Sequence, residues 1–214
     1  MASRRLLVVI QRLTRKLSPR MIKALQLVFS PFNAWMKLTA EQRSVSFILF
    51  FSLMPLVILC VGIEAYSLMR WGEKRGDLGL LVKVSQPVAI RYAAAHISLF
   101  VACVFLGAFG LQAVAQSFNL SATFRQAFTA IAYGTTPIVL GRLLDAVPVM
   151  NTWVCWGIGV MLSLSVLYHG VALTLRPDQT KGFGLYIVSL MIVLLVTGVA
   201  HFTALAVLHE KIFR

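Results

Sequence analysis

Long apolar stretches dominate the pattern of hydrophobic and polar positions along this chain. Asp, Glu, Lys and Arg are absent from five stretches, residues 44–63, 92–124, 126–141, 146–175 and 182–209, which contain 20, 33, 16, 30 and 28 residues. A helix rises about 1.5 Å per residue, so about 20 apolar residues cross a hydrocarbon layer about 30 Å thick. Four of the stretches reach this length and the third nearly does. The pattern therefore predicts helices that span a membrane.

The predicted architecture is an all-α, polytopic membrane helix bundle with five transmembrane helices. We place the spans at about 44–69, 93–118, 126–147, 153–175 and 183–209, within a five-span membrane domain that covers residues 44–214. The connections between the last three spans are short. We therefore expect spans three and four, and spans four and five, to form antiparallel hairpins.

The composition supports a membrane protein. Hydrophobic residues make up 59% of the chain and charged residues 13%, and the mean hydropathy is +0.84. This balance argues against a soluble enzyme, a disulfide-stapled secreted module and a disordered chain. The three cysteines, Cys60, Cys103 and Cys155, lie inside predicted spans without C-x-x-C spacing, so we interpret them as packing residues.

Residues 1–43 form a basic segment that precedes the first span. Nine of the 20 Lys and Arg residues lie there, with Glu41 as the single acid. Apolar positions in residues 4–17 recur at helical spacing, which predicts an amphipathic helix. Its opposite face carries Arg5, Arg12, Arg15 and Lys16. We expect this basic face to bind the anionic inner leaflet of the bilayer.

Two other interpretations of the basic segment stay open. It can be an ordered tail packed on the protein's own loops or on a neighbouring subunit. It can also be a cleavable mitochondrial targeting segment, which has the same abundance of Arg and shortage of acids.

The distribution of basic residues predicts the orientation. A cytoplasmic N-terminus places 12 Lys and Arg residues on the inner side and 7 on the outer side, as the positive-inside rule requires. With five spans the C-terminus then lies outside, and we expect a bacterial inner membrane. We therefore attribute the net charge of +13 to basic residues that set the membrane orientation, and we expect no nucleic-acid partner.

The third span contains the most unusual sequence. Residues 133–137 read Tyr-Gly-Thr-Thr-Pro, and the proline removes a backbone donor while the glycine allows close approach, so a kink is expected. Arg142 and Asp145 follow. Because they are three residues apart, they share one helix face and can partly neutralise each other.

Other ionisable residues fall at a similar predicted depth, namely Glu64 in the first span, His96 in the second and His201 in the fifth. Such groups inside a membrane suggest a proton or solute path that opens outward. The alternative is a structural ion pair between Glu64 and Arg142.

The sequence gives little support to haem binding or enzymatic chemistry. Histidines at positions 96, 169, 201 and 209 raise the idea of a haem held by two histidines, but nothing in the sequence sets two of them opposite each other. A phosphate-binding loop, a G-x-S-x-G elbow and an H-E-x-x-H pair are missing from the sequence. We therefore expect no cofactor, no metal and no enzymatic activity.

Two segments of the chain resemble segments of a known family. Residues 29–35, Phe-Ser-Pro-Phe-Asn-Ala-Trp, are similar to the Pro and Trp entry before the first span of Yip1-domain proteins. Residues 132–137, with Leu140, Leu143 and Leu144 and the hairpin into 153–175, resemble the family's Tyr-x-x-x-Pro segment and the helix after it. The resemblance covers roughly residues 29–208.

The resemblance implies a five-span bundle with a cytoplasmic N-terminus, which agrees with the charge distribution. Eukaryotic members are associated with Rab GTPases and vesicle traffic, whereas most prokaryotic relatives have no assigned activity. GTPase binding is left open for this chain. We expect a non-enzymatic membrane-organising protein or an accessory subunit that contacts other membrane subunits. The alternative is a small transporter or channel that uses Glu64, Arg142 and Asp145.

Overall fold

The computed structural model describes residues 26–75, 80–148 and 150–209 and is an all-α bundle, as predicted. Five of its helical segments are long and apolar enough to cross a membrane. The amphipathic helix predicted at residues 4–17 lies outside the described residues. So does its basic face of Arg5, Arg12, Arg15 and Lys16, which stays a prediction.

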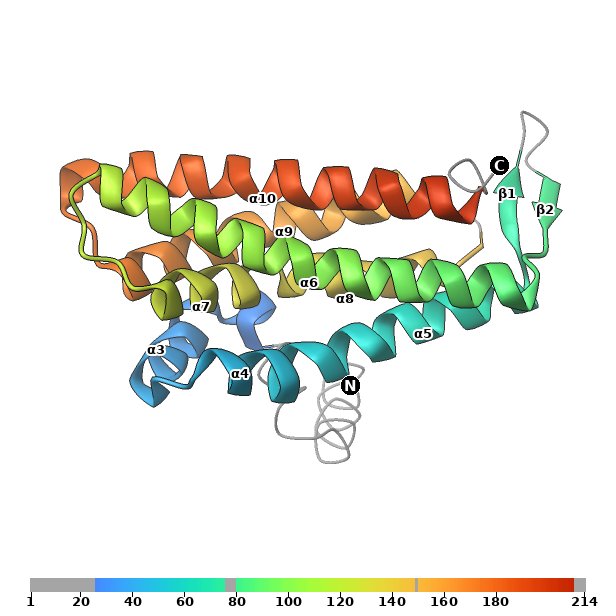
Figure 1. Ribbon diagram of the computed structural model, residues 1–214, viewed down its shortest axis with the longest axis horizontal. Helices are drawn as coiled ribbons and strands as arrows, with labels where there is room; N and C mark the ends of the chain where they lie inside the picture. Colours follow the sequence, from blue (N-terminus) through green and yellow to red (C-terminus); the bar gives the residue numbers. More distant parts are fainter. Residues whose placement is uncertain (1–25, 76–79, 149, 210–214) are drawn as a thin grey trace, which may run out of the picture.

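The spanning helices run along the long axis of the molecule (Figure 1). The first span comprises α4 (Val45–Phe47), a π-helical turn η1 (Ile48–Leu53) and α5 (Met54–Arg70), and the second is α6 (Gln86–Ser117). The third is divided into α7 (Phe124–Gly134) and α8 (Thr136–Asp145). The fourth is α9 (Thr152–Leu175) and the fifth is α10 (Gln179–Leu208). Helix α10 packs along α6, and α8 packs along α9.

The second span begins earlier than the charge pattern indicates. Helix α6 starts at Gln86 rather than near residue 93, with Pro87 in its first turn. Arg91 therefore lies inside the helix, where it is exposed. A long basic side chain at a helix end reaches the polar interface from within a helix, so a charge does not mark the helix boundary.

The π-helical turn in the first span ends two residues before Pro55. A proline inside a helix lacks the backbone N–H that continues the ladder, and its ring meets the carbonyl four residues earlier. A wider turn over Ile48–Leu53 removes this conflict without ending the helix.

The third span has the expected break. Helix α7 ends at Gly134 and α8 begins at Thr136, so that Pro137 stands in the first turn of α8. A Cβ atom at Gly134 would lie 2.3 Å from the Leu167 side chain on α9. Glycine therefore lets the two halves of this span approach α9 closely.

Helix α3 (Pro31–Glu41) packs on the end of the bundle opposite the small hairpin β1 (Glu73–Arg75) and β2 (Leu80–Val82) (Figure 1). Trp35 of α3 is fully buried, and its indole N–H donates to the Val166 carbonyl of α9 at 2.8 Å. A helix that precedes the first span thus contributes to the same core as the spans.

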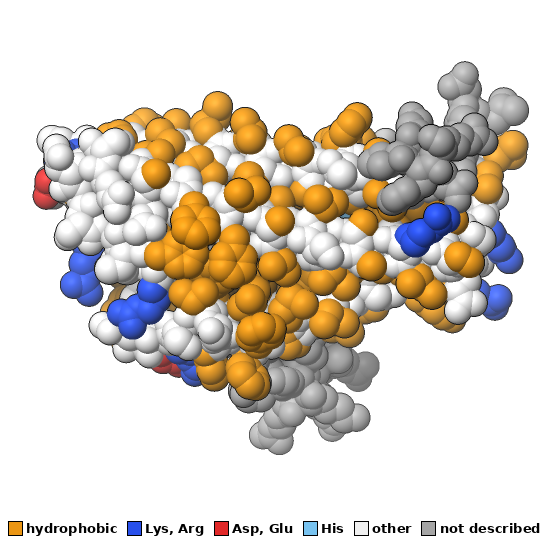
Figure 2. All heavy atoms as spheres, in the orientation of Figure 1, with side chains coloured by type: hydrophobic (Ala, Val, Ile, Leu, Met, Phe, Trp, Pro, Cys, Tyr) orange, Lys and Arg blue, Asp and Glu red, His pale blue; other side chains and the backbone are white. Residues whose placement is uncertain are grey.

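Apolar side chains cover the middle of the surface, and the Lys and Arg side chains on the face seen in Figure 2 lie toward the two ends. Helix α10 shows this pattern most strongly, with a stripe of exposed apolar residues at Phe183, Ile187, Met191, Leu195, Val199 and Phe202. An apolar exterior with charged ends is the arrangement expected of a bundle whose solvent is lipid.

Candidate functional site

The structure brings the predicted ionisable residues together in one buried cluster around Arg142. The guanidinium Nε lies 3.3 Å from Oε2 of Glu64 on α5. Its Nη1 lies 2.8 Å from Oδ2 of Asp145, one turn along α8. Arg142 and Glu64 are each 3% exposed. Isolated charges at such depth are very unfavourable, so the pairing is what allows both to stay in the core.

Two histidines complete the contacts of the guanidinium. Nη2 of Arg142 lies 2.7 Å from Nδ1 of His96 on α6, and Nη1 lies 3.0 Å from Nδ1 of His201 on α10. Because a guanidinium has donors only, both Nδ1 atoms accept hydrogen bonds. His96 and His201 therefore carry their proton on Nε2.

Tyr92 and Thr152 are members of the cluster that sequence reasoning missed. The Tyr92 hydroxyl accepts from Nη2 of Arg142 at 2.8 Å and donates to Oε1 of Glu64 at 2.5 Å. Thr152 Oγ1 lies 3.5 Å from Nη1 of Arg142 and 3.5 Å from Nε2 of His201. Tyr92 lies four residues before His96 on the same face of α6, which is the signal that could have identified it.

Every spanning helix contributes to this cluster. Glu64 comes from the first span, Tyr92 and His96 from the second, and Arg142 and Asp145 from the third. Thr152 opens the fourth span and His201 belongs to the fifth. The guanidinium therefore joins all five helices at one level of the bundle.

The cluster borders a cavity of about 410 Å³ that extends toward the end with the β1–β2 hairpin. Its walls include Glu64, Asp145, Thr152 and Trp153. Oε2 of Glu64 and Oδ1 of Asp145 accept no hydrogen bond from the described residues. Oε2 of Glu64 still pairs with Nε of Arg142 at 3.3 Å. The two carboxyl groups outnumber the one guanidinium beside this cavity, which we call the vestibule.

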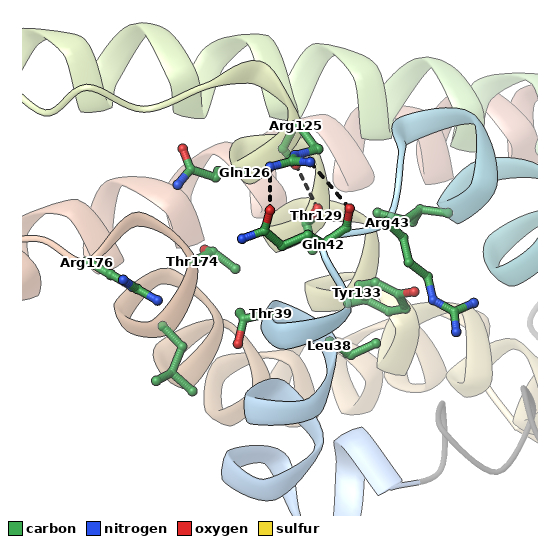
Figure 3. Close-up of a pocket in the computed structure, with 12 residues that line it drawn as sticks. Leu38, Thr39, Gln42, Arg43, Arg125, Gln126, Thr129, Tyr133, Thr174 and Arg176 are labelled. Atoms are coloured by element: carbon green, nitrogen blue, oxygen red, sulfur yellow. Dashed lines mark hydrogen bonds between the residues drawn. The ribbon is translucent and has the colours of Figure 1, made fainter.

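A second polar site lies at the opposite end of the bundle, where sequence reasoning placed none (Figure 3). This pocket of about 180 Å³ is lined by Arg43, Arg125 and Arg176 together with Gln42 and Gln126. We call it the basic pocket. The three arginines come from the loop before α4, the first turn of α7 and the residue after α9, so only the fold brings them together.

The two sites offer ion pairs and hydrogen bonds to charged groups. The described residues contain no group of three or more His, Cys, Asp and Glu side chains that could hold a metal ion. The cluster can anchor helices or hold a proton or cation at its carboxyl groups, and the basic pocket can hold an anion.

Comparison with known proteins identifies the family. The Yip1 domain model matches residues 25–200, which is most of the 214 residues. No curated protein and no solved structure matches the chain. The match confirms the resemblance seen in the Pro and Trp segment before the first span and in the Tyr-x-x-x-Pro segment of the third. The chain therefore belongs to the Yip1-domain family of integral membrane proteins.

Proposed function

We propose that this protein is a non-enzymatic membrane-organising protein or an accessory subunit of a larger membrane assembly. The observation that supports the proposal is that the Arg142 cluster links all five spans. Its guanidinium contacts side chains on the other four spans. A group held this way fixes the helices relative to one another, and a rigid bundle presents a constant outer surface to partners and lipids.

The core beyond the cluster supports a structural role. Val57 lies two turns before Glu64 on α5. Val104 lies two turns after His96 on α6, and Ile138 lies one turn before Arg142 on α8. All three are buried, and they belong to one continuous apolar core. An ion that entered from the vestibule would meet this apolar layer, where its transfer is strongly unfavourable.

The proposal includes an orientation and a set of partners. The basic N-terminal segment lies at the cytoplasmic face of a bacterial inner membrane and contacts anionic lipid, and the C-terminus lies outside. Other membrane subunits dock on the apolar exterior, and the exposed stripe of α10 is one such surface. Support for this orientation comes from the 12 to 7 distribution of basic residues.

A second candidate function is a small transporter or channel. The vestibule favours it, because Glu64 and Asp145 line this cavity and two carboxyl groups beside one guanidinium are suited to receive a proton or another cation.

Flux measurements in proteoliposomes distinguish the two functions. We expect the wild-type protein, Glu64→Gln and Asp145→Asn to give the same proton and monovalent-cation flux as empty liposomes. A wild-type flux that either substitution abolishes would establish the transporter. The matched control is Asp178→Asn, which removes an exposed carboxylate outside the vestibule.

Gentle extraction followed by mass spectrometry tests the accessory role. A subunit that co-purifies in constant stoichiometry supports it. A protein recovered alone under conditions that preserve other membrane complexes contradicts the accessory subunit and leaves the membrane-organising function.

A further inference from the structure

The basic pocket has an excess of positive charge. Arg43 pairs with Glu41 at 2.7 Å and stacks over the Phe47 ring at 4.3 Å. Arg125 makes two long contacts, of 3.3 Å each, to the carbonyl and the side-chain oxygen of Gln42. Arg176 has no hydrogen bond or ion pair with the residues that the structure describes. Among the described residues, two of the three cations therefore have no acid to balance them.

The pocket also provides neutral donors. Oε1 of Gln126 accepts from the Thr123 backbone N–H at 2.9 Å, so its amide NH₂ group stays available. Oε1 of Gln42 is occupied by Arg125, which leaves its NH₂ group available in the same way. Figure 3 shows both amides beside Arg125 and facing the space toward Arg176. Cations and amide donors around one space suit an anion with several oxygens, such as a phosphate group.

The backbone around the pocket is strained. Gln42 and Arg176 have φ angles of 41° and 46°, in the left-handed region that favours glycine. They follow the last residues of α3 and α9, where glycine would relieve the strain. Only three described residues other than glycine have a positive φ, and two of them line this pocket. Strain retained at a polar pocket points to a use for these side chains.

The depth of the pocket indicates the source of the phosphate. It lies where the first and third spans begin, at Val45 and Phe124, and where the fourth ends, at Leu175. Helix ends of this kind are level with lipid headgroups. The remaining walls include the apolar side chains Leu38, Ile48 and Leu173, which can contact the glycerol and the first acyl carbons of a lipid but offer nothing to a soluble ion.

We propose that the basic pocket binds the phosphate group of an anionic phospholipid, through Arg125 and Arg176 with the amides of Gln42 and Gln126. Basic pockets between spanning helices are known to take such headgroups. The site goes beyond the proposed function, because it names a lipid class and a location that a general membrane-organising role does not require.

Native mass spectrometry of the full chain tests this site. The protein is purified in detergent with equimolar phosphatidylglycerol and phosphatidylcholine, and the lipid retained on the protein is counted. The test variant is Arg125→Gln/Arg176→Gln. The control is Arg70→Gln/Lys83→Gln, which removes two positive charges from exposed positions at the other end. A third variant, Arg125→Lys/Arg176→Lys, keeps both charges, and circular dichroism checks that each variant is folded.

We expect the wild type to prefer phosphatidylglycerol by about tenfold, since each basic residue near the lipid surface contributes about a severalfold effect. The Gln variant should lose this preference, and the control and the Lys variant should keep most of it. An equal loss in the control would overturn the proposal. So would a wild-type protein that shows no preference for phosphatidylglycerol.

Inorganic phosphate at about 10 mM should not displace the lipid, and phosphate binding without lipid preference would assign the pocket to a soluble anion instead. None of these outcomes depends on flux, so the proposed function and the lipid site can fail separately.

Discussion

Nη1 of Arg142 and Nδ1 of His201 lie 3.0 Å apart although the two residues are 59 positions apart in the chain. A guanidinium cannot accept a hydrogen bond, so the imidazole must be neutral at Nδ1. The same holds for His96. The positive charge is therefore matched by Glu64 and Asp145 alone, while the histidines orient the guanidinium without adding charge.

This assignment predicts how substitutions of His201 differ. In His201→Asn the side-chain oxygen takes about the position of Nδ1 and can accept from Arg142, whereas His201→Leu leaves a buried donor without a partner, which costs about 1–3 kcal/mol. We expect the thermal unfolding midpoint in detergent to fall clearly for the Leu variant and little for the Asn variant. Equal midpoints for the two variants would show that Nδ1 of His201 is not an important acceptor.

Removal of the central cation should be the most damaging change in the cluster. Arg142→Gln leaves Glu64 and Asp145 buried without a positive partner, and breaking a buried pair in this way costs about 3–5 kcal/mol. The double variant Glu64→Gln/Arg142→Gln should recover part of the loss, because the remaining buried charge is smaller. Thermal unfolding in detergent measures both, with the exposed Arg70→Gln as control. A double variant less stable than the sum of the single changes would contradict this account.

The sequence alone identifies ionisable residues that lie at a similar depth in the membrane spans. Glu64, His96, Arg142, Asp145 and His201 could be grouped beforehand, because charges are rare in apolar spans and each lies at a countable distance from a span end. The spacing of Arg142 and Asp145 also predicted that they could pair, and an ion pair between Glu64 and Arg142 was one of the alternatives. The contacts of His96 and His201 with Arg142 could not be predicted, since helix rotation is set by packing. The kink at residues 134–137 follows from backbone chemistry and was also predictable.

Other features depend on tertiary packing and have no local signal. Trp35 lies in the Pro and Trp segment before the first span, and no local pattern indicates that it is buried at 0% exposure. Its ring fits because Gly170 on α9 leaves room for it. The basic pocket escaped prediction for a similar reason. Arg43, Arg125 and Arg176 are far apart in sequence, and each alone is an ordinary cation at a span end.

Glycine contacts predict a sharp difference between two neighbouring positions on α9. A Cβ atom at Gly159 would lie 2.7 Å from the Ile138 Cα atom, whereas one at Gly157 would meet nothing within 4 Å. Gly159→Ala must therefore push α8 away from α9, and overpacking of this kind costs about 1–3 kcal/mol. Gly157→Ala should leave the thermal midpoint unchanged. Equal effects would mean that α8 and α9 are not in close contact.

The docking of α3 can be tested at Gly170. A Cβ atom there would lie 2.5 Å from Cζ2 of the Trp35 ring, so Gly170→Ala should displace the indole from Val166. We expect trypsin to cleave after Lys37 and Arg43 several times faster in this variant, because α3 opens more often. Gly157→Ala is again the control. Unchanged cleavage would indicate that Trp35 does not anchor α3.

Single cysteines at two exposed loop positions test the orientation. Ser121 lies between α6 and α7, and Met150 lies between α8 and α9, so the third span separates them. With a cytoplasmic N-terminus, a membrane-impermeant maleimide added to intact cells should label Met150→Cys and not Ser121→Cys, and disrupted cells should show both. The native cysteines Cys60, Cys103 and Cys155 are buried, so the wild type should give little background. Labelling of Ser121→Cys alone in intact cells would reverse the topology and remove the basis for a cytoplasmic basic segment. Labelling of both variants in intact cells would mean that the broken third span does not cross the membrane.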